Sequence, residues 1–178
     1  MTTTSPDAVQ SRGRTWLGAV LRTPPADRRV DVALVAVRIA LAWIFVYYGA
    51  GKLFGSFNGP GIHGTSQFMA DTAHLHPGGL FAVLGGALEL GGAIALVLGI
   101  GSRLVGIGLF VDMVMAMVTV TWTNGIHPTN APPAGVGNLA GYEVNVALAT
   151  LALVVALLGA GRFSLDALAS RRLAATGE

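Results

Sequence analysis

The chain contains no cysteine, and charged residues make up only 11% of its 178 positions. Without cysteine, disulfides, thiolate nucleophiles, cysteine-ligated zinc, iron–sulfur clusters and covalently attached haem are excluded. The shortage of charge excludes a soluble enzyme, a disordered chain and a nucleic-acid-binding protein, because a soluble domain typically carries about 25% charged residues. The sequence pI of about 9.5 does not change this conclusion, since eight of the twenty charged residues fall in the first 31 positions and most of the rest lie near the ends of long apolar runs.

The sequence is rich in long apolar runs: 53% of the residues are hydrophobic and the mean hydropathy is +0.64. A transmembrane helix needs about 20 consecutive, mostly apolar residues. Four stretches meet this requirement, namely 31–50, 80–100, 104–123 and 142–160. We therefore predict an all-α polytopic membrane protein, a four-transmembrane-helix bundle with short interfacial helices. The membrane domain covers residues 31–160, between a basic tail of residues 1–30 and a C-terminal tail of residues 161–178.

The basic residues predict the orientation of this domain in the membrane. The arginines outside the spans lie before the first span, between the second and third spans, or after the fourth, which are all on one side of the membrane. Lys52 is the only lysine or arginine on the other side. Since cytoplasmic loops carry the excess of Lys and Arg, both tails are predicted to be cytoplasmic.

Both tails contain segments that fit the membrane surface. In the N-terminal tail, Trp16, Leu17, Val20 and Leu21 form an apolar stripe at helical spacing. In the C-terminal tail, Ser164 is placed to cap a short helix with an apolar face. We expect amphipathic helices on the inner membrane surface, with a frayed basic tail as the alternative for the N-terminal segment.

Three ionisable residues lie inside predicted spans, where each charge costs roughly 2.5–3.5 kcal/mol on the lenient insertion scale. At 1.5 Å per residue from the cytoplasmic ends, Arg38 lies about 9 Å deep, Asp112 about 12 Å and Glu89 about 16 Å. Glycine and alanine flank both carboxylates one helical turn away, which predicts close helix packing on these faces. We therefore predict a buried Arg38–Glu89–Asp112 cluster that either handles a proton or headgroup, or only holds three helices together.

A second set of polar residues is predicted to rim an outward-facing vestibule above this cluster. It comprises Lys52 at the end of the first span, Tyr142 and Glu143 at the start of the fourth, and His63 and His127 in the outer loops. The alternative for Lys52 and Glu143 is a simple interfacial salt bridge. No metal site is predicted, because the histidines lack cysteines or an acidic pair at ligand spacing.

The first outer loop contains a candidate lid over this vestibule. The segment from Ser66 to Leu75 has apolar residues at Phe68, Met69 and Leu75 and is long enough for a short helix. We expect it to lie across the vestibule at the interface, with an ordinary loop over the helix ends as the alternative.

Short motifs spread over all four spans resemble the DoxX family of small inner-membrane proteins. They are Arg38, Gly49-Ala50-Gly51-Lys52-Leu53, Glu89-Leu90-Gly91-Gly92, Leu98-Gly99-Ile100, Arg103, Gly141-Tyr142-Glu143 and Gly161-Arg162-Phe163-Ser164-Leu165-Asp166. The resemblance covers about residues 30–168, and its specificity comes from the ordered set of motifs.

The resemblance implies a bacterial inner (plasma) membrane protein similar to the DoxD subunits of thiosulfate:quinone oxidoreductases. The preferred hypothesis is therefore a subunit of a quinone-linked oxidoreductase system that binds a quinone headgroup or handles its proton, without a covalently bound cofactor. Two other classes stay open: a non-catalytic anchor or assembly partner of a peripheral redox protein, and a membrane protein that binds a small solute or lipid. The expected partners are the lipid bilayer and either a peripheral redox protein or a second copy of the chain.

Overall fold

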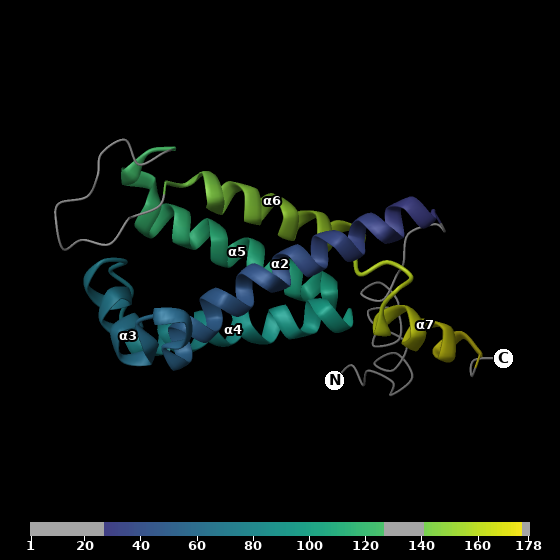
Figure 1. Cartoon of the computed structure of the whole chain (residues 1–178), viewed down its shortest axis with the longest axis horizontal. Coiled ribbons are helices and arrows are strands. Elements are labelled where there is room, and N and C mark those ends of the chain that lie inside the picture. Colours follow the sequence, from purple (N-terminus) through teal and green to yellow (C-terminus); the bar gives the residue numbers. More distant parts are fainter. Residues whose placement is uncertain (1–26, 127–140, 176–178) are drawn as a thin grey trace, which may run out of the picture.

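The computed structural model describes residues 27–126 and 141–175, and the described residues contain helices but no strand (Figure 1). The elements are α2 (Arg28–Phe54), η1 (Ser56–Asn58), α3 (Gly61–Asp71), α4 (Gly78–Leu98), α5 (Ser102–Ala116), the π-helical turn η2 (Met117–Thr121), η3 (Trp122–Asn124), α6 (Glu143–Leu158) and α7 (Leu165–Ala175). This confirms the predicted all-α fold.

Three of these helices are long and apolar enough to cross a membrane: Arg28–Phe54, Gly78–Leu98 and the continuous helical stretch Ser102–Asn124. They correspond to the first three predicted spans, although the first helix begins before residue 31 and continues beyond residue 50. The fourth predicted span contains α6, whose 16 residues form a shorter apolar helix. The chain is thus a membrane protein by the length and composition of its helices.

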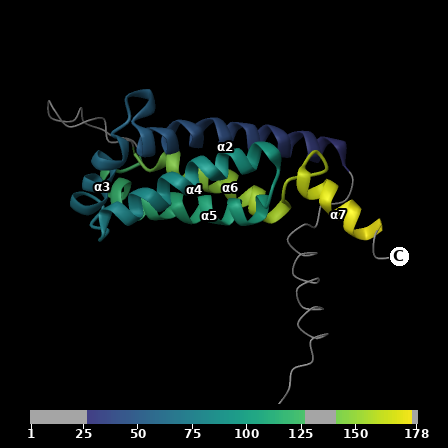
Figure 2. The same cartoon turned by 90° about the horizontal axis from the view of Figure 1, so that it is seen from below.

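The four helices α2, α4, α5 and α6 run side by side along the long axis of the molecule (Figures 1 and 2). The pairs α2–α4 and α5–α6 make the most extensive contacts. Fully buried residues from all four helices form one core, including Leu41, Leu96, Leu109 and Val155. Helix α3 lies at one end of the bundle, beside Lys52, and α7 lies at the other, beside Arg38. We call these the Lys52 end and the Arg38 end.

Glycines allow each of these helix pairs to approach closely. On α5, a Cβ at Gly106 would lie 2.7 Å from the amide nitrogen of Ala156 and 2.8 Å from the carbonyl oxygen of Ala152, both on α6. On α2, Gly49 packs in the same way against the backbone of α4. Small residues at contacts of this kind hold helices together in a membrane, where lipid removes the hydrophobic drive for helix association.

The Arg38 end is held by a buried arginine that binds backbone carbonyls at the ends of two helices. The guanidinium of Arg38 donates to Leu96 O (2.7 Å) and Val97 O (2.9 Å) at the end of α4. It also donates to Ala160 O (2.8 Å) and Phe163 O (2.9 Å), just after α6. The last carbonyls of a helix lack intrahelical partners, and Arg38 supplies donors to them in a site where its side chain is buried.

Two carboxylates at the same end accept hydrogen bonds from backbone amides. Asp166 is buried and accepts from the amides of Gly101 (2.8 Å) and Ser102 (3.1 Å), which caps the start of α5. Asp31 is also buried and accepts from the amide of Arg162 (2.9 Å).

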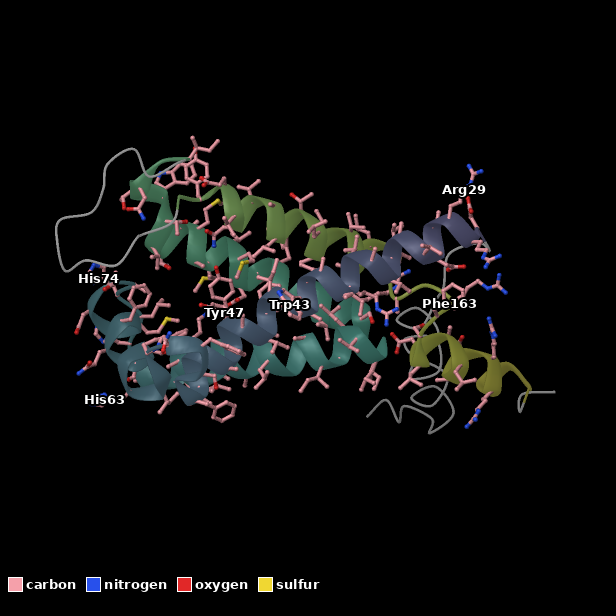
Figure 3. All side chains as sticks on the ribbon, viewed as in Figure 1. Arg29, Trp43, Tyr47, His63, His74 and Phe163 are labelled. Atoms are coloured by element: carbon pink, nitrogen blue, oxygen red, sulfur yellow. The ribbon has the colours of Figure 1, made fainter. Side chains whose placement is uncertain are left out.

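The predicted C-terminal helix is present as α7. The hydroxyl of Ser164 accepts a hydrogen bond from the amide of Ala167 at 3.1 Å, as expected for a cap at this residue. Phe163 beside it is exposed and lies next to the α7 end of the bundle (Figure 3). The amphipathic segment predicted around Trp16–Leu21 lies outside the described residues.

Candidate functional site

The Lys52 end contains a buried ion pair between α2 and α4. Lys52 Nζ donates to Oε1 of Glu89 at 2.6 Å. The side chain of Glu89 is 1% exposed and that of Lys52 is 25% exposed, so the lysine connects a buried carboxylate to the surface. Lys52 can reach Glu89 because α2 continues to Phe54 and keeps Lys52 on the buried face that also carries Phe45 and Gly49.

Asp112 of α5 completes this site. Its carboxyl group interacts electrostatically with the carboxyl group of Glu89 and with the ammonium of Lys52. Gly85 of α4 lies next to it, since a Cβ there would be 3.9 Å from Oδ1 of Asp112, an ordinary van der Waals contact. Oε2 of Glu89 and Oδ2 of Asp112 are buried and receive no hydrogen bond from an N–H or hydroxyl group of the described residues. The site therefore holds two carboxyl groups, one ammonium and two buried oxygens able to accept hydrogen bonds.

An apolar cavity of about 460 Å³ lies beside these groups, between α3, α4 and α5. Lys52 and Asp112 are its charged residues, and we call it the Asp112 cavity. Its remaining walls are mostly apolar, formed by Phe68, Met69, Leu75, Phe81, Leu84, Gly85, Leu88, Gly108, Val111, Met115, Ala116, Thr119, Val120 and Thr121. Cavities of this size and character are typical of sites for small organic ligands, which they orient through a few polar groups.

The candidate lid segment forms part of the wall of this cavity. Its residues 66–71 belong to α3, which begins earlier than predicted, at Gly61, and Phe68, Met69 and Leu75 all line the Asp112 cavity. Helix α3 is tied to the end of α2 by Thr65, whose hydroxyl donates to the carbonyl of Lys52 at 3.2 Å.

The opposite wall contains an irregular helical turn. Thr119, Val120 and Thr121 line the cavity and belong to the π-helical turn η2. Turns of this type occur mostly as short insertions in α-helices and are frequent at functional sites. This turn is held against α6 by Thr121, whose hydroxyl donates to Oδ1 of Asn145 at 3.2 Å.

The predicted cluster of Arg38, Glu89 and Asp112 is wrong in one member, the cation. Glu89 and Asp112 do lie together, but their cationic partner is Lys52, and Arg38 binds backbone carbonyls at the other end of the bundle. The long arginine side chain points toward its own end of the helix, where unpaired carbonyls are available. Lys52, expected at the interface, reaches inward because its helix is longer than predicted.

The predicted vestibule differs in the partner of Lys52, which pairs with Glu89 and not with Glu143. His63, Tyr142 and Glu143 are not among the described lining residues of the two cavities that include Lys52. Tyr142 stacks on Trp122 with ring centroids 5.5 Å apart, and His63 is exposed on α3 (Figure 3). His127 lies outside the described residues. Within residues 27–126 and 141–175, no three His, Cys, Asp or Glu side chains form a group suited to a metal ion.

Comparison with known proteins agrees with the resemblance seen in the sequence. The family model described as DoxX matches residues 33–122, which include Lys52, Glu89 and Asp112. The inner membrane protein YphA of Escherichia coli (strain K12) is 31% identical over 136 residues, which cover 76% of this chain and 89% of that protein. No solved structure matches the chain.

Proposed function

The chain belongs to the DoxX family, and we propose that it is an inner-membrane subunit of a bacterial quinone-linked oxidoreductase system that binds a quinone headgroup in the Asp112 cavity. In this proposal both termini are cytoplasmic and α6 crosses the membrane with the three longer helices. A peripheral redox partner exchanges electrons with the quinone, and this chain binds and orients the headgroup.

The observation that carries this proposal is a pair of charged side chains, Lys52 and Asp112, in the wall of a mostly apolar cavity. Oδ2 of Asp112 is able to accept a hydrogen bond from a hydroxyl of a quinol, while Glu89 is buried behind this wall and paired with Lys52. Lys52 donates to Glu89 with one N–H and retains two more, which suit the carbonyl oxygen of a quinone. The apolar walls fit the ring, and the location among membrane helices suits its isoprenoid tail.

Charge supports the same assignment. Two carboxyl groups face one ammonium, so full ionisation would leave one negative charge in a membrane interior, where it is costly. A proton held between the two carboxyl groups would remove this charge, and the hydroxyl donors of a bound quinol would stabilise it. When bound, a quinone supplies a redox centre that takes up and releases protons together with electrons, and the carboxyl groups of Glu89 and Asp112 would hold such a proton.

The test is binding of a short-chain ubiquinol to the purified protein in lipid nanodiscs, followed by calorimetry. We choose Asp112→Asn as the variant because it leaves the Lys52–Glu89 pair intact. The loss of a charged acceptor should weaken binding by about tenfold. The control is Asp71→Asn, which changes an exposed aspartate at the end of α3 and should not alter binding.

Other outcomes would favour the other classes of function. Unchanged affinity in Asp112→Asn would contradict the headgroup site. If the native protein co-purifies with phospholipid or a small solute and no quinone, the cavity serves that molecule instead. If no ligand binds and Asp112→Asn only lowers stability, the chain is better described as an anchor or assembly partner, with a peripheral redox protein or a second copy as its partner.

A further inference from the structure

Lys52 also lines a second cavity, on the side of α2 and η1. This cavity has a volume of about 460 Å³ and lies between the end of α2, η1 and the start of α3. Its polar lining residues are Tyr47, Tyr48, Lys52, Ser56, Asn58 and Thr65, and we call it the Tyr48 cavity. Lys52, Phe68 and Met69 line both this cavity and the Asp112 cavity, so these side chains form the boundary between them.

The two cavities differ in chemistry. The Asp112 cavity has an apolar lining with one carboxylate, whereas the described lining of the Tyr48 cavity combines hydroxyl and amide groups with one ammonium and includes no carboxylate. Neutral groups that both donate and accept hydrogen bonds are suited to holding water. The ammonium of Lys52, 25% exposed, thus borders the more polar of the two cavities on one side and contacts a carboxylate that is 1% exposed on the other.

The part of the Tyr48 cavity wall formed by η1 has a constrained backbone. Phe57 and Asn58 have φ values of 56° and 61°, which side-chain-bearing residues rarely adopt. Phe57 stacks on Tyr47 with ring centroids 5.1 Å apart, and Gly59 packs directly on the backbone of Gly51. Strained conformations of this kind persist where the surroundings enforce them, often at ligand clamps and switch regions.

We infer that the Tyr48 cavity is the aqueous entrance to the buried site, through which water reaches Lys52 and protons of the Glu89–Asp112 site exchange with the solution. The inference rests on the proposed function only for the identity of the headgroup whose protons exchange. The lipid-soluble part of the ligand enters from the Asp112 cavity, and the aqueous phase reaches the same site from the opposite side of Lys52.

The sequence allows a direct test, because Lys52 is its only lysine and it contains no cysteine. A water-soluble, sulfonated acetylating reagent is added at a fixed alkaline pH to the full chain in nanodiscs, and acetylation of the peptide containing Lys52 is followed by mass spectrometry. In the Ser56→Cys variant, the new thiol is capped either with a bulky maleimide or with a small methylthio group. The small cap is the matched control for the substitution itself.

The bulky cap should slow acetylation of Lys52 roughly tenfold, corresponding to about 1.4 kcal/mol on the barrier. The methylthio cap, and Thr119→Phe, which fills part of the Asp112 cavity, should leave the rate within about twofold of the native value. An unchanged rate with the bulky cap would overturn the inference. So would slowing by Thr119→Phe, since the reagent would then be arriving through the Asp112 cavity.

These results are separable from those for the proposed function. If the quinol does not bind but the bulky cap still slows acetylation of Lys52, the quinone proposal is rejected and the inferred entrance stands. Normal quinol binding with acetylation insensitive to the bulky cap would retain the proposed function and reject the entrance.

Discussion

Gly49 of α2 packs directly on the backbone of α4, where a Cβ would lie 2.6 Å from the amide nitrogen of Leu90. Leu90 follows Glu89 in the chain, and Lys52 lies three residues after Gly49 on the same face of α2. The distance between the two helices at Gly49 therefore determines whether Lys52 can reach Glu89.

We predict that Gly49→Ala separates α2 from α4 and destabilises the protein. The added methyl group meets main-chain atoms of α4, which cannot move aside as a flexible side chain can. Overpacking of this kind typically costs about 1–3 kcal/mol. The measurement is the thermal unfolding midpoint in detergent, together with quinol binding, which should weaken because Lys52 moves away from Glu89.

Gly91→Ala is the matched control for this prediction. Gly91 lies on α4 two residues after Glu89, and a Cβ there would meet nothing within 4 Å. Alanine is the better helix former by about 1 kcal/mol, so this variant should be as stable as the native protein or more stable. Equal effects of the two substitutions would show that glycine is not needed for contact at residue 49.

The long helices were predictable because hydrophobic runs report membrane spans directly. The buried face of α2 also follows from helical spacing, since Arg38, Phe45, Gly49 and Lys52 share it. The partners of the charged residues were not predictable from depth alone. Depth counting places a Cα along the membrane normal, but a long cationic side chain reaches several ångströms toward either end of its helix.

Helix ends were the second source of error. The apolar run predicts a first span that ends at residue 50, with Lys52 at the interface, whereas α2 ends at Phe54 with Gly55 in the left-handed conformation. A glycine just beyond a helix is the sequence signal for its end, and Gly55 has this role with a φ of 71°. The carbonyls bound by Arg38 likewise follow from the termination of two helices near Gly99 and Gly159, which places free acceptors beside it.

Arg38→Lys should destabilise the protein although it retains the positive charge. The planar guanidinium donates to four carbonyls from two segments, and a single ammonium cannot reproduce this geometry. Unpaired buried carbonyls cost about 1–3 kcal/mol, and the unfolding midpoint should fall accordingly. Quinol affinity measured on the folded fraction should not change, because Arg38 lies at the end of the bundle away from Lys52.

Arg29→Lys is the control for this variant, since Arg29 is exposed at the start of α2 and donates to Oδ1 of Asp27 through its backbone amide. It should unfold at the native temperature. A loss of quinol binding in folded Arg38→Lys would contradict the assignment of Arg38 to the fold and return it to the ligand site.

The Lys52–Glu89 pair should show strong coupling in a double-mutant cycle. Lys52→Met leaves a carboxylate that is 1% exposed without its cation, which should cost roughly 3–5 kcal/mol of unfolding free energy. Lys52→Met combined with Glu89→Gln removes both charges and should recover much of this loss. Additive effects of the two single substitutions would show that the pair contributes no interaction energy.

The last prediction concerns the orientation of the chain and the role of α6. At 1.5 Å per residue, a helix of this length extends about 24 Å, somewhat less than the hydrocarbon thickness of about 30 Å. It nevertheless runs alongside α5, and their backbones meet closely at Gly106 and Ala156. We therefore expect α6 to cross the membrane with α5, which places α7 on the same side as the start of α2.

Single cysteines in the cysteine-free chain provide the measurement. Gln67 is exposed on α3 and Ala169 is exposed on α7. In intact spheroplasts, an impermeant maleimide should label Gln67→Cys, and should label Ala169→Cys only after the membrane is permeabilised. Labelling of both from outside would show that α6 does not cross. Labelling of Ala169→Cys alone would invert the orientation and place the Tyr48 cavity on the cytoplasmic side, so that Lys52 would exchange protons with the cytoplasm.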